Sequence, residues 1–153
     1  KVEKGGQAVT CAVRAIIEEE GERGISTPKF YIGFQERAEK IKEEFNEFLR
    51  REKSKGASIV GYGAAAKANT LLNFAQADVS QIHYIVDQNP AKQGTYTPGS
   101  RIPVVTEDNL KRDKPDYIII FPWNLRDEIQ EYLAYTRSWG ARLVVVFPEL
   151  EIC

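Results

Sequence analysis

Beyond Gly56 the chain alternates between short apolar runs and stretches with helical periodicity, and this alternation is its most constraining feature. The apolar runs cover residues 58–62, 82–86, 102–105, 117–121 and 143–147, and helical patterns cover residues 64–74, 107–112 and 124–138. Strands that are apolar along their whole length are buried on both faces, which is typical of a parallel sheet covered by helices. The sequence therefore predicts an α/β fold with helices on both faces of the sheet.

The apolar positions of two helices predict which faces they bury. We expect the inward positions to be Leu71, Leu72 and Phe74 in the first, and Leu125, Ile129, Tyr132 and Leu133 in the last. Gly140 follows the last helix as its expected C-terminal signal. His83 falls inside a predicted strand, where a lone histidine is more often structural than catalytic.

An N-terminal helical segment precedes the α/β part. Residues 8–20 form one candidate helix. A longer helix is expected over residues 27–54, with Thr27 as N-cap, Pro28 in the first turn and Lys55-Gly56 at its end. Its apolar stripe of Phe34, Ala38, Ile41, Phe45 and Phe48 has helical spacing. We accordingly divide the chain into a linker or helical segment, 1–26, and a C-terminal module, 27–153, that includes the lead-in helix 27–54.

Composition excludes several classes of function. The 153 residues carry 21 Lys+Arg against 22 Asp+Glu, and this near-neutral balance argues against a nucleic-acid partner. No apolar run approaches the length of a membrane span. Two distant cysteines and one histidine make neither a disulfide framework nor a metal site, so we expect no metal, reduced thiols and a cytoplasmic location. The absence of methionine favours a piece of a longer polypeptide.

The informative motif is a glycine turn at the first strand-to-helix junction. Gly61 and Gly63 permit a tight turn, and Ala66 fits the third small position of a dinucleotide-binding fingerprint. The helix that follows would direct free N–H groups and a positive dipole end at a phosphate. Asp87, at the end of the second strand, is placed to accept hydrogen bonds from a ribose. The alternative is that the glycines serve packing alone.

Lys67 strengthens the phosphate hypothesis. A cation in the first helical turn is disfavoured by the helix dipole, and a bound phosphate would remove that conflict. Asn69 and Thr70 follow and would add donors. The alternative is an exposed lysine that reaches outward.

Two further clusters fall at the carboxyl ends of strands, where open α/β sheets bind ligands. Asn89 and Lys92 lie in the loop after Asp87, although Asn89-Pro90 is also a simple turn former. Trp123 is placed either to stack on a base or sugar or to cover the core. Asn124 is expected to cap the next helix.

Five segments in order resemble the C-terminal domain of the sugar C-methyltransferases, which use S-adenosylmethionine to methylate a ring carbon of nucleotide-linked deoxysugars. They are GYGAAAKANTLLN (61–73), VDQNPAKQG (86–94), YTPG (96–99), IPV (102–104) and PWNL (122–125). The resemblance covers residues 27–150. It implies a Rossmann-like module against which the nucleotide sugar lies.

By this resemblance, the substrate site would be lined by Gly61, Tyr62, Gly63, Lys67, Asn69, Thr70, Asp87, Asn89, Lys92 and Trp123. Ala68 departs from the glycine usual in the family and would narrow the approach of a phosphate. The family's zinc motif, its methyl-donor domain and its catalytic tyrosine- and histidine-rich segment are not found in this sequence. We expect no catalytic residue here, no cofactor bound by this chain, and no activity without an upstream methyltransferase domain.

The leading hypothesis is therefore the nucleotide-sugar-binding domain of a methyltransferase that uses S-adenosylmethionine when intact. A dinucleotide-binding regulatory or oxidoreductase Rossmann module is one alternative. The other is an interaction domain in which the long helix packs on a partner.

Overall fold

The computed structural model describes residues 9–153, and the chain divides into two units. They are Lys1–Ala38 and Glu39–Cys153, and the boundary between them lies within a helix. Residues 1–8 of the predicted segment 1–26, including the predicted helix start at Ala8, lie outside the described residues. The predicted division after residue 26 stays a prediction.

The described residues of the first unit, 9–38, form helices and include no buried side chain. Helix α1 (Cys11–Glu22) begins after Thr10, whose side chain accepts a hydrogen bond from the Val13 amide at 3.4 Å. None of its residues is buried, and Val13, Ile16 and Ile17 are each more than 40% exposed. The 3₁₀ helix η1 (Pro28–Tyr31) follows Thr27.

The continuous helix predicted for residues 27–54 is wrong in its first part. After η1 the backbone at Gly33 adopts φ +78°, which a regular helix does not accommodate, and helix α2 (Phe34–Ser54) begins only at the next residue. Its predicted end is confirmed, because Gly56 takes φ +81° two residues after Ser54.

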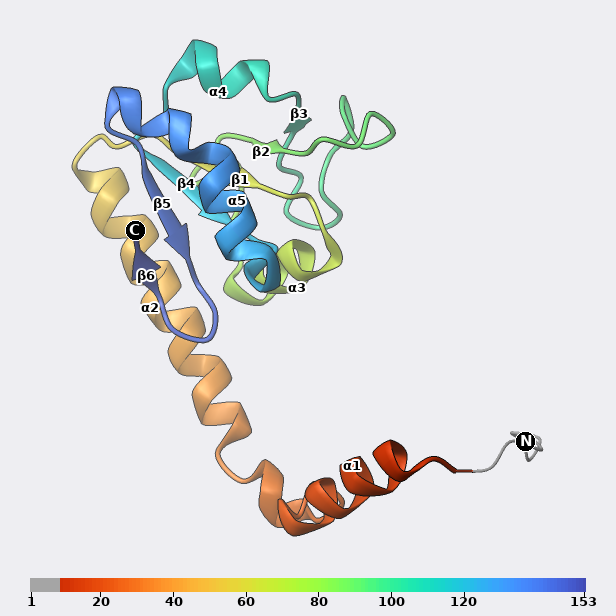
Figure 1. Ribbon diagram of the computed structural model, residues 1–153. Coiled ribbons are helices and arrows are strands. Elements are labelled where there is room, and N and C mark those ends of the chain that lie inside the picture. Colours follow the sequence, from red (N-terminus) through yellow and green to blue (C-terminus); the bar gives the residue numbers. More distant parts are fainter. Residues whose placement is uncertain (1–8) are drawn as a thin grey trace. The chain divides into compact units, whose positions relative to one another are not determined.

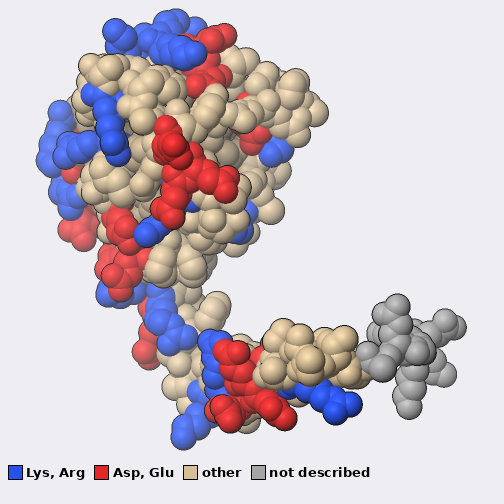
Figure 2. Space-filling model, viewed as in Figure 1, with Lys and Arg blue, Asp and Glu red and all other residues tan. Residues whose placement is uncertain are grey.

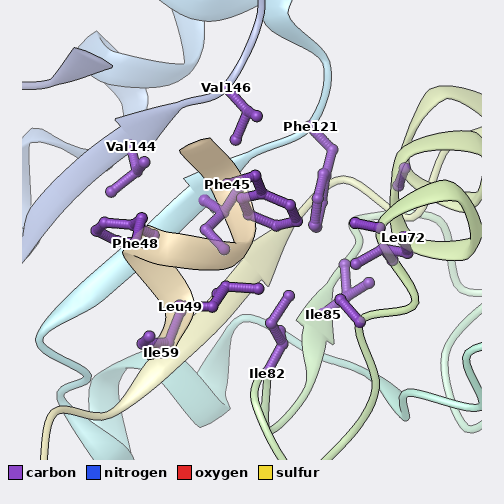
Figure 3. Close-up of a cluster of buried hydrophobic side chains, with 14 of the residues drawn as sticks. Phe45, Phe48, Leu49, Ile59, Leu72, Ile82, Ile85, Phe121, Val144 and Val146 are labelled. Carbon is purple, nitrogen blue, oxygen red and sulfur yellow. The ribbon is translucent and has the colours of Figure 1, made fainter. Parts of the chain in front are cut away.

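Helix α2 carries part of the main core in its second half. Phe45, Phe48 and Leu49 are almost completely buried. Figure 3 shows Phe48 beside Val144 and the Phe45 ring directed toward Phe121, all in one buried cluster with Ile59. The predicted stripe is therefore confirmed from Ile41 onward, whereas Phe34 is 62% exposed.

Within residues 9–153, one six-stranded sheet has the strand order β3-β2-β1-β4-β5-β6 (Figure 1). The strands are β1 (Ile59–Tyr62), β2 (Ile85–Val86), β3 (Val104–Val105), β4 (Tyr117–Ile120), β5 (Arg142–Val145) and β6 (Glu151–Ile152). All neighbours are parallel except β5 and β6. This confirms the α/β, Rossmann-like fold class. Strand β6 was not predicted, because two residues with one apolar side chain give no periodic signal.

Helices cover both faces of the sheet, as predicted (Figure 1). Helices α2 and α3 (Ala66–Ala75) pack with Ile59 of β1 on one face. Helices α4 (Asp108–Asp113), α5 (Arg126–Tyr132) and η3 (Leu133–Trp139) pack with the next strand residue, Val60, on the other. Successive strand residues point to opposite faces, so each strand contributes to both cores.

Three of the predicted inward positions are wrong. Phe74, Leu125 and Tyr132 are 37%, 43% and 49% exposed. The helix predicted over residues 124–138 is η2 (Trp123–Leu125) followed by α5 and η3. Ile129 and Leu133, four residues apart, face the sheet, and Tyr132 lies about 100° around the helix from Leu133. Gly140 ends η3 with φ +85°, as predicted.

Strand β2 is shorter than predicted, and His83 lies before it rather than within it. The His83 amide still donates to the Ile59 carbonyl at 3.0 Å.

No helix among residues 9–153 has both the length and the apolar character needed to cross a bilayer.

Candidate functional site

The glycine turn joins β1 to α3 and is shaped by close packing. A Cβ on Gly61 would lie 2.5 Å from the Phe121 ring, and a Cβ on Gly63, where φ is +88°, would collide with the Pro122 ring. Both glycines are therefore needed for packing whether or not a ligand binds. The same absence of side chains leaves the backbone of the turn open to a ligand.

No side chain in the described part of the chain caps the N-terminus of α3 by accepting from its free N–H groups. Ala65 occupies the N-cap position and cannot accept a hydrogen bond from the first turn. The first intrahelical bond of this turn is donated by the Asn69 amide to the Ala65 carbonyl at 3.2 Å. The preceding N–H groups remain available to an anion, as at other uncapped helix N-termini.

Lys67 stands directly at this helix end, and its ammonium group is held in place. It donates a hydrogen bond to Asn124 Oδ1 and lies 4.9 Å from the centre of the Trp123 ring. Among residues 9–153 it forms no ion pair with a carboxylate. Lys67 therefore does not simply reach outward, and its charge is available to a ligand.

Asn124 does not cap the next helix, contrary to the prediction. It lies in η2, and α5 begins after Leu125 without a side-chain cap. Trp123 is half-buried and packs against the second core, with its ring centre 5.0 Å from that of Phe147. It thus covers part of the core. Stacking of Trp123 on a ligand stays a prediction.

Asp87, directly after β2, stabilises the glycine turn through hydrogen bonds to its carboxylate. Its Oδ2 accepts hydrogen bonds from the Ala64 amide at 2.8 Å and from Lys92 Nζ at 3.0 Å, and its Oδ1 accepts one from the Asn89 amide at 2.9 Å. Asn89 Oδ1 in turn accepts from the Ala91 amide. These groups therefore hold the loop and the glycine turn together, and the Asp87 carboxylate already has three donors.

The remaining predicted residues lie along α3. Thr70 is exposed and donates its hydroxyl to the Ala66 carbonyl at 3.1 Å. Asn69 Oδ1 is buried and has no hydrogen-bond partner among residues 9–153, which is unusual for a buried polar atom. Ala68 is completely buried in the core, so its methyl group faces the sheet rather than a phosphate at the helix end.

Sequence reasoning missed a cleft of 420 Å³ beside the glycine turn. We call it the tyrosine cleft, and its lining includes Tyr62, Gly63, Gln88, Leu125, Ile129 and Tyr132. These residues come from the end of β1, the loop after β2, η2 and α5. Because these segments are far apart in the sequence, no local motif predicts the cleft. The available signal was Tyr62, which is a large polar side chain at the carboxyl end of a buried strand.

Hydrogen bonds fix the tyrosines around this cleft. Glu107 accepts from the hydroxyls of Tyr132 and Tyr135 at 2.5 and 2.6 Å, and Gln88 Nε2 donates to the Tyr62 hydroxyl at 2.9 Å. Burial raises the pKa of Tyr62 to about 12, and the nearby Glu107 carboxylate acts in the same direction. Tyr62 is therefore protonated at neutral pH and serves as a wall and hydrogen-bonding group rather than as a base.

A larger hollow of 560 Å³ lies elsewhere, where α2 meets the opposite end of α3 at Gln76. Its lining includes Glu43, Glu47 and Arg50 and does not include the glycine turn.

Figure 2 shows both acidic and basic side chains on the drawn face of the molecule. No group of three potential metal ligands occurs within the described part of the chain.

The family of C-methyltransferase C-terminal domains matches residues 1–148 of this chain. The chain belongs to this family. This C-methyltransferase C-terminal domain is 31% identical over 141 residues to the C-methyltransferase NovU of Streptomyces niveus. The match covers 92% of this chain and 34% of that protein, so the domain spans about a third of its relative's length. The resemblance drawn from the five sequence segments is thereby confirmed.

Among solved structures, the C-methyltransferase C-terminal domain is similar to UDP-D-quinovosamine 4-dehydrogenase from Vibrio fischeri. The sequence identity is 14% and the TM-score is 0.44. The similarity covers 63% of this domain and 93% of that chain.

Proposed function

We propose that this domain binds the nucleotide-linked deoxysugar substrate of a sugar C-methyltransferase. The observation that carries the proposal is the ammonium group of Lys67, in the uncapped first turn of α3, which contacts Asn124 and Trp123 and has no carboxylate partner among residues 9–153. A diphosphate at the glycine turn would accept hydrogen bonds from the free N–H groups of the helix and would pair with the positive charge of Lys67.

In this proposal the intact enzyme has an upstream domain that binds S-adenosylmethionine and carries the catalytic base. This domain contributes Gly61, Gly63, Lys67 and Trp123 to the substrate site, with Asn69 and Thr70 beside them on α3. Asp87, Asn89 and Lys92 hold the turn in shape. The domain alone would transfer no methyl group. We place the enzyme in the cytoplasm, in keeping with the free thiols Cys11 and Cys153.

The dinucleotide-binding alternative is less well supported. In that class of site an acidic residue after the second strand accepts hydrogen bonds from the ribose. Here the Asp87 carboxylate already accepts from two backbone amides and Lys92. These three donors leave little of its acceptor capacity for the hydroxyl groups of a ribose.

Titration calorimetry of this chain with a thymidine diphosphate deoxysugar tests the proposal. We expect saturable binding that Lys67→Ala weakens about 10- to 150-fold, since a hydrogen bond to a charged group contributes about 1.5–3 kcal/mol. Lys40→Ala is the control, because it removes the same charge from an exposed ion pair on α2. Absence of binding below millimolar concentration, or equal effects of both variants, would refute the proposal. Tighter binding of a nicotinamide dinucleotide would favour the alternative.

A further inference from the structure

The tyrosine cleft and the glycine turn form one continuous surface. Gly63 belongs to both, since it is the first residue of the turn after β1 and also lines the cleft. Tyr62 precedes it on β1 and Pro122 follows β4, so the cleft opens at the carboxyl ends of two adjacent parallel strands. Because Gly63 has no side chain, nothing at this position separates the turn from the cleft. A ligand with its diphosphate at the turn can therefore extend into the cleft.

The walls of the cleft are aromatic and aliphatic. The rings of Tyr62 and Tyr132 have centres 6.4 Å apart and are tilted by 47°. Pro122, Leu125 and Ile129 supply the rest of the apolar lining. Such walls favour a planar, weakly polar group that packs against aromatic rings.

The hydrogen bonds of the cleft argue against a sugar as its occupant. A sugar ring needs several hydrogen-bond partners for its hydroxyl groups, whereas the Tyr132 hydroxyl already donates to Glu107 and the Tyr62 hydroxyl, which accepts from Gln88, has one proton left to donate. The other polar side chains of the lining are Asp87, whose carboxylate already has three donors, and the exposed Gln88 and Glu128, of which Gln88 also donates to Tyr62. An amide and a carboxylate at one rim match the polar edge of a nucleobase.

Resting on the proposed function, we propose that the tyrosine cleft binds the nucleoside base of the nucleotide sugar, with the diphosphate at the glycine turn. The base lies against Tyr132 and the apolar lining, and its polar edge faces Gln88 and Glu128. The hexose then extends from the other end of the diphosphate, away from the cleft. Glu107 positions Tyr132 and Tyr135 without touching the ligand.

Calorimetry with thymidine diphosphate and inorganic pyrophosphate separates this inference from the proposed function. Base stacking on an aromatic ring contributes about 1–3 kcal/mol, so thymidine diphosphate should bind about 5- to 150-fold more tightly than pyrophosphate. Tyr132→Ala should abolish most of this difference and leave pyrophosphate binding unchanged. Tyr132→Phe keeps the ring and should retain most of the difference.

The outcomes are distinct. If neither ligand binds, the proposed function fails and this inference fails with it. If both bind equally, or if Tyr132→Ala leaves the difference intact, the base lies elsewhere and only this inference is overturned. If Tyr132→Ala weakens a thymidine diphosphate hexose but not thymidine diphosphate, the cleft holds the hexose and the inference is wrong.

A measurement on the unmodified chain guards against a variant that fails to fold. In saturation-transfer NMR with thymidine diphosphate, irradiation of the protein should saturate the base protons more strongly than the ribose protons, because the base is the buried part. Equal or weaker saturation of the base protons would overturn the inference.

Discussion

Gly63 is the residue of the glycine turn that tolerates substitution least. Its φ of +88° is unfavourable for any residue with a Cβ, and the added atom would collide with Pro122. We expect Gly63→Ala to lower the free energy of unfolding by about 2–4 kcal/mol, combining the backbone cost with overpacking. Urea denaturation measures this change.

The matched control is Gly94→Ala. Gly94 has φ +79°, but apart from its two chain neighbours no described residue has an atom within 4 Å of an added Cβ. This variant should therefore show only the backbone cost of about 1–2 kcal/mol. Equal losses in the two variants would mean that the contact with Pro122 is not what requires glycine in the turn.

Glu52 is a second residue with a specific role, because its side chain is only 4% exposed and yet ends in an ionised carboxylate. The hydrogen bond from Arg51 lowers the pKa of Glu52 to about 2 despite desolvation, and Lys55 and Tyr117 act in the same direction. The ordinary value is 4.5. Ionised Glu52 therefore stabilises the fold fully above about pH 4.5. This contribution is lost as the pH falls through about 2.

Glu52→Gln tests this linkage. The variant should be less stable at neutral pH by about 1–3 kcal/mol, because Arg51, Lys55 and the buried Tyr117 hydroxyl lose their anionic partner. Its free energy of unfolding should also depend less on pH between 4.5 and 2, as measured by urea denaturation at several pH values. Glu43→Gln, at an exposed position of the same helix, should retain the unmodified pH profile. A parallel pH dependence in Glu52→Gln would contradict the argument.

At the scale of the element, α2 combines an exposed beginning with a buried end. Phe45→Ala should lower the free energy of unfolding by about 3–5 kcal/mol, because Phe45 is fully buried between α2 and the sheet. Phe34→Ala makes the same chemical change at a position that is 62% exposed, and it should have an effect within about 0.5 kcal/mol. Urea denaturation of both variants measures the contrast, and similar losses would mean that the packing of α2 differs from that described.

The elements that the sequence predicted well are those whose signal is local. A run such as 117–121, apolar throughout, has few environments other than a buried strand. The errors arose where tertiary contacts decide the outcome. Tyr132 is apolar enough to be assigned to the core, yet Glu107, from a distant segment, holds its hydroxyl at the surface. Strand β6 forms only because β5 offers an edge.

The candidate site shows the same division. The glycine turn and Lys67 are contiguous in sequence and were identified from it. The partners Asn124 and Asp87 are 57 and 23 residues distant from the groups they bind, and their roles required the fold. The tyrosine cleft combines four separate segments, so no spacing rule predicts it.

At the scale of the whole molecule, the two units differ in what stabilises them. All buried residues of α2 belong to the unit Glu39–Cys153, which also contains every strand among the described residues. The unit Lys1–Ala38 contributes no buried side chain in α1 or η1. The conformational stability of the chain should therefore reside in residues 39–153.

A chain truncated to residues 39–153 tests this division. It should keep cooperative unfolding with a melting temperature within a few degrees of the full chain, because it retains the complete core and no side chain among residues 9–38 is buried. Loss of cooperative unfolding would show that the first unit stabilises the second.

Sedimentation of the same two chains tests a separate property of the first unit, its tendency to self-associate. The exposed Val13, Ile16, Ile17 and Phe30 favour self-association, so the full chain should associate with rising concentration while the truncated chain stays monomeric.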